Sequence, residues 1–245
     1  MRRVTSPLRL PALILCAVLA LAGCGLPPPA QPATPLPQAD IAARARQAVL
    51  NFDEVVTRVQ PVAEQVCREE TPEQTCDFAV YVDRAPESGV NAFHTIDPEG
   101  RPAIIFTLGL IAVAQNTDEL AFIMGHEAAH HIARHLAAGQ REAAEGARVF
   151  AERARARGAS ANEIGEAAQV GFIVASREFG QRAELEADAI GTIIAARAGY
   201  DPLVGSDFFR RIPDPAREFL STHPPNAARL DVVLSTLRAM GRPLP

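Results

Sequence analysis

The chain has 245 residues, of which 48% are hydrophobic and 22% are charged. This composition is that of a globular protein, and it excludes a disordered chain and a polytopic membrane protein. Its 24 basic residues are outnumbered by 29 acidic residues, which gives a net charge of -5. An acidic chain without a basic stripe is a poor nucleic-acid binder, so we expect no nucleic-acid partner. The length suits one sizeable domain.

The first 23 residues have the pattern of an export signal. Arg2, Arg3 and Arg9 accompany the apolar stretch LPALILCAVLALAG, which is too short to span a bilayer comfortably. A membrane anchor helix that is kept is the alternative interpretation. The following LAGC resembles the lipobox of bacterial lipoproteins, in which the signal is cut before the cysteine and the thiol is lipidated. This resemblance implies that Cys24 is the lipidated N-terminus of the mature chain.

The residues after Cys24 indicate where the anchor goes and where the domain starts. Gly25 stands where enteric lipoproteins of the inner membrane have Asp, so we expect a periplasmic protein anchored in the outer membrane. The proline-rich stretch LPPPAQPATPLPQA predicts an extended tether. The predicted organisation is a signal peptide at 1–23, a lipidated and proline-rich tether at 24–39, and one folded domain at 40–245.

The mature chain retains two cysteines, Cys67 and Cys76, because Cys16 leaves with the signal and Cys24 is lipidated. In an oxidising compartment, such a pair favours a disulfide. A metal site with two thiolates is the alternative, but no nearby residue completes a tetrahedral set of ligands.

The remaining pattern predicts an α+β domain that is mainly helical. Helical apolar spacing and β-rich runs bounded by turn residues indicate the elements. The first element is a helix at 40–59 that Pro61 bends or ends. Strands follow at 77–82 and 102–107, with an extended segment 89–96 and a tight turn 97–100 between them. From Leu108 onward we expect helices, with Gly199 and Gly241 as C-terminal caps.

Two helical stretches follow the predicted strands. The segment NTDELAFIMGHEAAHHIARHLAAG predicts a helix that begins at Asn116 or Thr117 and stops at Gly139. The segment 139–176 contains two helical pieces interrupted by glycines. These pieces form either a mobile lid over a cleft or ordinary packing.

The first of these helices carries the pattern H-E-x-x-H. His126 and His130 are four residues apart, so their imidazoles lie on one face and can bind one cation. Glu127 follows the first histidine, where its carboxylate can reach a metal-bound water without being a ligand. His131 and His135 form a second pair on another face. Because no glutamate accompanies them, we expect them to face solvent or to support the ligands.

A metal centre of this kind needs a third protein ligand. The metzincin pattern is excluded, because Leu136 and Ala133 stand where its histidine and glycine would be. The later segment QRAELEADAIGTIIAARAG supplies carboxylates on a helix. Glu184 and Asp188 share one face and Glu186 lies nearly opposite, so Glu184 can bind the metal while Asp188 accepts from the free N–H of a ligand histidine. A surface helix with three acids is the alternative.

Six blocks, VNAFHTI, TLGLI, NTDELAFIMGHEAAHHIARH, SREFGQRAELEADAIG, AGYDP and STHPPNAARL, occur in order between about residues 90 and 232. This order resembles that of the HtpX-like and CAAX-prenyl-protease-like zinc peptidases of peptidase family M48. The resemblance implies a zincin-like (gluzincin) fold with a small sheet beside the active-site helix and one zinc ion per chain. It implies these roles: zinc ligands His126, His130 and Glu184, catalytic acid/base Glu127, and Asp188 behind a ligand.

The last block contains two further candidates. The resemblance implies that His223 lies near the zinc, where it either stabilises the oxyanion or occupies the open metal position in a latent state. A histidine that caps a helix before two prolines is the alternative. Arg229, six residues later, is expected to pair with an active-site carboxylate.

The chain resembles the periplasmic lipoprotein branch of the family. This implies a zinc endopeptidase of the bacterial cell envelope that cleaves peptide bonds of unfolded or misassembled envelope proteins with a metal-activated water and a glutamate base. An extended substrate is expected to add to the sheet edge at 90–94. The alternative is an envelope assembly factor or holdase with a latent or structural zinc site. The sequence makes no prediction of oligomeric state.

Overall fold

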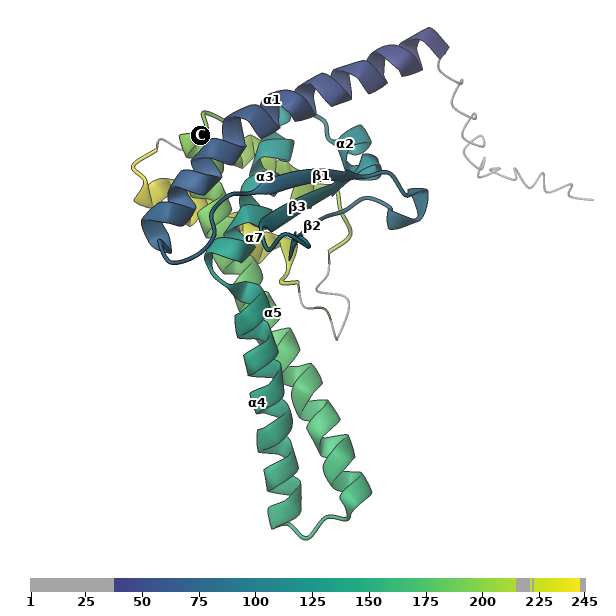
Figure 1. The fold of residues 1–245 in the computed structure, drawn as a ribbon, viewed down its shortest axis with the longest axis vertical. Helices are drawn as coiled ribbons and strands as arrows, with labels where there is room; N and C mark the ends of the chain where they lie inside the picture. The colour runs from purple at the N-terminus through teal and green to yellow at the C-terminus, as the bar shows by residue number, and fades with distance from the viewer. Residues whose placement is uncertain (1–37, 215–220, 222, 243–245) are drawn as a thin grey trace, which may run out of the picture. The chain divides into compact units, whose positions relative to one another are not determined.

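The computed structural model describes residues 38–214, 221 and 223–242. The predicted signal peptide, the predicted lipidation site Cys24 and the tether up to residue 37 lie outside this part of the chain. None of the helices described there is both long and apolar enough to cross a membrane. Helices dominate the described chain, which also contains one small sheet (Figure 1).

The first helix, α1 (Gln38–Glu70), continues through Pro61. The prediction that this proline could end the helix was therefore wrong. Proline removes one backbone hydrogen bond and crowds the preceding turn. Val59, Ala63 and Cys67 are fully buried on both sides of it, so contacts with the core hold the helix together across this position.

The sheet has three strands in the order β1-β3-β2. β1 (Ala79–Asp83) is parallel to the central strand β3 (Pro102–Thr107), and β2 (Ala92–Ile96) is antiparallel to it. A short 3₁₀ helix, η1 (Pro86–Ser88), separates β1 from β2 along the chain. Both predicted strands and the predicted extended segment are confirmed, and β2 forms one edge of the sheet.

The helix that carries H-E-x-x-H is α3 (Thr117–Ile132), which follows the short α2 (Leu108–Val113). Asn116 caps α3 as predicted, because its side chain accepts a hydrogen bond from a backbone N–H of the first turn at 2.8 Å. The predicted end at Gly139 was wrong. The helix stops at Ile132 because Arg134 adopts a left-handed conformation, with φ of 59°.

After this break, α4 (His135–Ala156) and α5 (Ala161–Arg197) run side by side (Figure 1). Gly146 and Gly171 lie where the two helices touch, and neither position has room for a Cβ. The segment 139–176 therefore belongs to two helices that pack against each other.

The C-terminal part consists of α6 (Pro202–Ser206), the 3₁₀ helix η2 (Asp207–Arg210) and α7 (Asn226–Ala239). Gly199 and Gly241 have φ of 88° and 70° and follow α5 and α7 in the left-handed conformation predicted for helix caps. A small second core joins this part to α3 and consists of Phe122, Phe209, Val233 and Leu237.

The main core lies between α1, the sheet and α3. α3 is its central element, because 12 of its 16 residues are buried. The other face of α3 contacts α5, which in turn contacts α7. The predicted fold class, a mainly helical α+β domain of the zincin-like type with a small sheet beside the motif helix, is confirmed.

The predicted disulfide between Cys67 and Cys76 is confirmed. The loop that it closes lies against the C-terminal end of α3. The Gln74 side chain donates to a backbone carbonyl in the last turn of α3 at 3.1 Å. The Thr75 carbonyl lies 2.8 Å from Nε2 of His131 and, because a carbonyl only accepts, this nitrogen carries the proton. The bridged loop thus caps the end of the motif helix.

α3 and α5 approach each other closely at two glycines. A Cβ on Gly191 would lie 2.7 Å from the backbone nitrogen of His126, and a Cβ on Gly125 would lie 2.8 Å from the carbonyl oxygen of Gly191. Only glycine lets the two backbones meet at this distance. Because the contact adjoins His126, it fixes the position of α5 relative to the motif helix.

Replacement of Gly191 by alanine should therefore push the helices apart and lower the free energy of unfolding by roughly 1–3 kcal/mol, the usual range for overpacking. Gly165 lies on the same helix with nothing within 4 Å of an added Cβ. There the same substitution should stabilise the protein by about 0.5–1 kcal/mol, because alanine has less backbone freedom to lose. Urea denaturation measures both values. Equal stability of Gly191→Ala and the wild type would contradict the close contact.

Candidate metal centre

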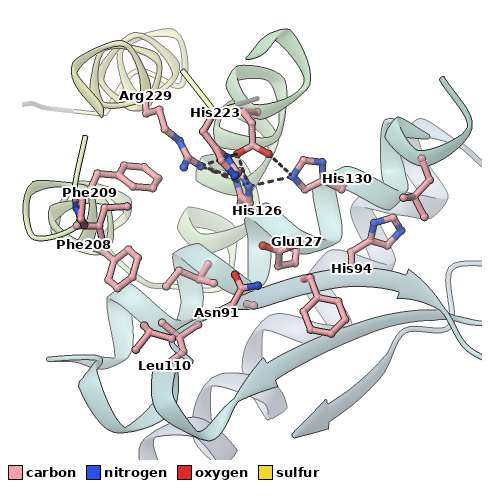
Figure 2. Close-up of a pocket in the computed structure, with 18 residues that line it drawn as sticks. Asn91, His94, Leu110, His126, Glu127, His130, Phe208, Phe209, His223 and Arg229 are labelled. Carbon is pink, nitrogen blue, oxygen red and sulfur yellow. Dashed lines mark hydrogen bonds and ion pairs between the residues drawn. The ribbon is translucent and has the colours of Figure 1, made fainter. Parts of the chain in front are cut away.

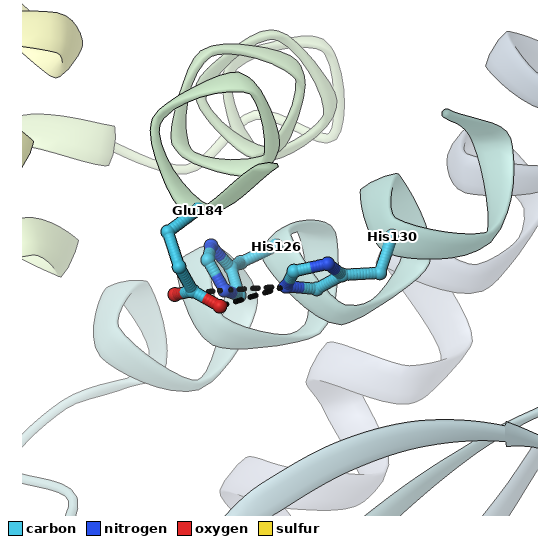
Figure 3. A group of neighbouring side chains, drawn as sticks. All are labelled: His126, His130 and Glu184. Carbon is cyan, nitrogen blue, oxygen red and sulfur yellow. Dashed lines mark hydrogen bonds and ion pairs between the residues drawn. The ribbon is translucent and has the colours of Figure 1, made fainter. Parts of the chain in front are cut away.

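His126 and His130 from α3 and Glu184 from α5 form one cluster (Figure 3). The Nε2 atoms of the two histidines are 3.1 Å apart. One carboxylate oxygen of Glu184 lies 3.4 Å from Nε2 of His126, and the other lies 3.4 Å from Nε2 of His130. Tetrahedral ligands at zinc distances of 2.0–2.1 Å are about 3.3 Å apart. The three donors therefore have the spacing needed to hold one cation.

The charge at Glu184 also fits a bound cation. Its Oε2 atom is buried and, among the described residues, makes no well-oriented hydrogen bond. Although burial disfavours the charged form, contacts with His126, His130 and His223 hold the pKa of Glu184 far below its usual range. The carboxylate is therefore ionised, and a bound cation would give this oxygen a well-oriented partner.

Asp188, one turn after Glu184, orients the first histidine. Its carboxylate is fully buried and lies 2.9 Å from Nδ1 of His126. Because the pKa of Asp188 is lowered by hydrogen bonds from Arg229 and His126 despite its burial, this carboxylate only accepts. Nδ1 of His126 therefore carries a proton, and Nε2 is the nitrogen that faces the cluster.

Arg229, from α7, holds Asp188 from the opposite side. Its Nε and Nη2 atoms each donate to a different oxygen of the carboxylate at 2.7 Å. This bidentate contact is the strongest geometry available to an arginine and a carboxylate. The guanidinium also lies 3.9 Å above the ring of Phe209. The expected pairing of Arg229 with a carboxylate of the site is thus observed, and its partner is Asp188.

Glu127 lines the same cavity as the cluster (Figure 2). Burial raises the pKa of Glu127, and the charge of Glu184 raises it further. The two glutamates therefore differ in chemistry. Glu184 stays ionised, whereas Glu127 has an increased affinity for a proton, a property that suits acid–base chemistry.

The cavity has a volume of about 680 Å³. The segment Val90 to His94 forms one wall, and α3 and α5 contribute the cluster. Phe208 and Leu110 add apolar surface (Figure 2). Burial, with smaller effects of three neighbouring histidines, lowers the pKa of His94 to about 3, so this ring is neutral at physiological pH.

His223 lies beside the cluster, as the sequence predicted. Its Nδ1 atom is 3.1 Å from Oε2 of Glu184, and its side chain is 53% exposed (Figure 2). The ring therefore stands at the open side of the cavity, within reach of a group bound there. Its part in the chemistry stays a prediction.

His131 and His135 are both buried, with exposures of 8% and 7%. The expectation that they could face solvent was wrong, and the alternative expectation, contact with a predicted ligand, agrees with the position of His135. His131 donates away from the cluster, to the bridged loop. His135 contacts His130, with 2.9 Å between their Nδ1 atoms, and its Nε2 atom lies 3.3 Å from a carboxylate oxygen of Glu186. Spacing along a single helix did not predict these contacts, because no sequence signal marks the break at Arg134.

A helix with H-E-x-x-H beside a small sheet, with a carboxylate from a second helix as the third donor, is the arrangement of a metal-dependent peptidase. The sequence model of peptidase family M48 matches residues 50–237, and the chain belongs to this family. Members of this family are metal-dependent peptidases.

The chain is similar to several proteins of known name. It is 31% identical over 140 residues to the beta-barrel assembly-enhancing protease of Escherichia coli (strain K12), which covers 52% of this chain and 29% of that protein. It is 30% identical over 166 residues to the mitochondrial metalloendopeptidase OMA1 of Saccharomyces cerevisiae, which covers 63% of this chain and 45% of that protein. The chain therefore spans less than half the length of each of these relatives.

The buried pair of Asp188 and Arg229 should dominate the stability of the site. An Asp188→Asn substitution keeps the shape but leaves the Arg229 charge with Glu184, 3.4 Å away, as its nearest counterion in the described part of the chain. We expect the free energy of unfolding to fall by roughly 3 kcal/mol. Chemical denaturation in the presence of a chelator measures this value without a metal contribution.

An exposed ion pair provides the control. Arg148 contacts two glutamates, and all three side chains are about half exposed. Arg148→Ala should leave the denaturation midpoint unchanged, because solvent screens such pairs. If Asp188→Asn unfolded at the same denaturant concentration as this control, Asp188 would not have the structural role assigned to it.

Proposed function

We propose that this protein is a zinc-dependent endopeptidase of the bacterial cell envelope that hydrolyses unfolded or misassembled envelope proteins. The observation that carries the proposal is the triangle of donor atoms from His126, His130 and Glu184, 3.1 to 3.4 Å apart, in one cavity with Glu127. Zinc prefers nitrogen and oxygen donors in this tetrahedral spacing.

Each residue of the cluster has a proposed part in the reaction. His126, His130 and Glu184 hold the zinc ion, which supplies Lewis-acid chemistry that acidifies water and polarises a peptide carbonyl. Glu127 accepts the proton of the attacking water and returns it to the leaving amine. Its raised pKa, caused by burial, suits both transfers. Asp188 keeps the first ligand in the tautomer that this requires.

His223 is the proposed oxyanion donor. Its exposed ring stands at the open side of the cavity, 3.1 Å from a carboxylate oxygen of Glu184. A small rotation of this ring would direct an N–H at a carbonyl oxygen bound over the cluster, which is where negative charge develops. The contact with Glu184 also suits a latent state in which this ring covers the site until a substrate displaces it.

The free edge of β2 is the proposed substrate-binding strand. The Asn91 carbonyl accepts from Thr107 and the Asp97 N–H donates to Arg101, so the odd-numbered residues between them pair with β3. The backbone groups of Ala92 and His94 consequently face the free edge beside the cavity. Pairing through the main chain is tolerant of sequence, which suits unfolded proteins as substrates.

The envelope location rests on the N-terminal sequence, the disulfide and the relatives. LAGC indicates lipidation at Cys24 and, with Gly25 after it, an anchor in the outer membrane. The bridge between Cys67 and Cys76 suits an oxidising compartment. The similar bacterial protein is named a beta-barrel assembly-enhancing protease, which is compatible with substrates among envelope proteins.

A Glu127→Gln variant tests the catalytic proposal. The amide keeps the size of the side chain but accepts no proton, so cleavage of unfolded casein by the zinc-loaded protein should fall by about 10²–10⁴-fold. Zinc content, measured by atomic absorption, should stay at one ion per chain in both proteins. If the wild type degraded casein no faster than the variant, the protease proposal would fail and an assembly factor or holdase with a latent or structural zinc would be favoured.

The anchor is tested separately by expressing the full chain with Cys24→Ser. Loss of the lipidated thiol should move the protein, once its signal is cleaved, from the membrane fraction to the soluble periplasmic fraction, because the acyl chains that anchor it are absent. Mass spectrometry of the wild-type N-terminus should show the acyl chains on Cys24. Unchanged fractionation of the variant would rule out this cysteine as the anchor.

A further inference from the structure

We propose that His135 is a positioning residue that orients the ligand His130, and that Glu186 fixes His135 in turn. The inference rests on the proposed role of His130 as a metal ligand. It adds two residues behind this ligand, His135 and Glu186. His126 has Asp188 behind it. The structure assigns a different kind of support to the second ligand.

The contacts form a continuous chain of three side chains. The Nδ1 atoms of His130 and His135 are 2.9 Å apart, and their rings are nearly perpendicular, at 71°. The Nε2 atom of His135 lies 3.3 Å from Oε2 of Glu186. His135 is buried, whereas the Glu186 side chain is 61% exposed. We call this row of contacts, from His130 through His135 to Glu186, the relay. It begins at the cluster and ends at the protein surface.

The chemistry of imidazole fixes the direction of each hydrogen bond. A histidine that binds a cation through Nε2 must carry its proton on Nδ1. Nδ1 of His130 therefore donates, and Nδ1 of His135 must accept. The proton of a neutral His135 then lies on Nε2, from which it donates to the carboxylate of Glu186. Every ring nitrogen of the two histidines thus has one defined role.

The backbone break places His135 beside its partner. On a continuous helix, a residue five positions after His130 would be rotated by about 140° and would point away from it. Arg134 prevents this continuation with its φ of 59°, and its N–H donates to the carbonyl of His131 at 2.9 Å. A left-handed conformation costs a non-glycine residue roughly 1–2 kcal/mol. This strained residue redirects the chain so that the start of α4 meets the end of α3.

Packing alone could also account for a buried ring at this position, because His135 lies 6.0 Å from the ring of Phe179. Two substitutions separate these explanations. Asparagine places an acceptor oxygen near the position of Nδ1, whereas leucine has nearly the same shape as asparagine and no acceptor. A role in packing makes the two variants alike in metal binding, but a role in positioning makes them differ.

The experiment measures the zinc affinity of the whole chain by competition with a chromophoric chelator, with the unfolding midpoint of each metal-free protein alongside. His135→Leu should weaken zinc binding by about 10–100-fold, the usual effect of losing a group behind a ligand. His135→Asn should bind zinc nearly as tightly as the wild type. His131→Leu is the control, because this buried histidine donates away from the cluster, and its zinc affinity should be unchanged.

Equal zinc affinity of His135→Leu and the wild type, or an equal loss in the leucine and asparagine variants, would overturn the proposal. A wild-type protein that binds no zinc would instead refute the metal centre itself, and the inference with it. Nitrogen NMR of the zinc-loaded wild type requires no variant to fold. It should show the His135 proton on Nε2, and a proton on Nδ1 would contradict the relay.

Discussion

The close contact of α3 and α5 is the constraint on which the site depends. Gly125 and Gly191 let the two backbones meet where no side chain would fit. Asp188 and Glu184 lie about one and two helical turns before Gly191, so they share its face toward α3. Both carboxylates therefore reach His126 and its neighbours. A larger residue at the contact would move both carboxylates at once, so the two glycines help to position the candidate metal centre.

The buried charges of the site divide into two groups. Two hydrogen bonds from Arg229 compensate the charge of Asp188, so this pair is complete within the protein. Glu184 has only longer contacts and an oxygen without a well-oriented hydrogen bond among the described residues. The Asp188–Arg229 pair thus maintains the geometry of the site, while Glu184 retains a negative charge that a bound cation would neutralise. This division explains why adjacent turns of one helix carry two acids with unlike surroundings.

The sequence predicted the parts of the site that depend on regular helices. The four-residue spacings of His126 with His130 and of Glu184 with Asp188 place each pair on one face wherever the helix lies. The strands could also be predicted from the sequence, because apolar runs bounded by turn residues are typical of them. The contact of His135 with His130 could not be predicted from the sequence, because it depends on the left-handed conformation of Arg134. Arginine has no preference for that conformation. The prediction that the first helix could end at Pro61 failed for a related reason, because contacts with the core outweighed the local effect of proline.

The disulfide between Cys67 and Cys76 affects the motif helix by restricting the unfolded chain. A ring of this size removes about 2–3 kcal/mol of conformational entropy from the unfolded state. Gln74 and Thr75 lie inside this ring and contact the last turn of α3. The groups that cap this helix are thus held in a narrow range of conformations before the helix forms. The terminal turn is the part of an isolated helix that frays most easily. In this protein it contacts the bridged loop, which loses little further conformational entropy on folding.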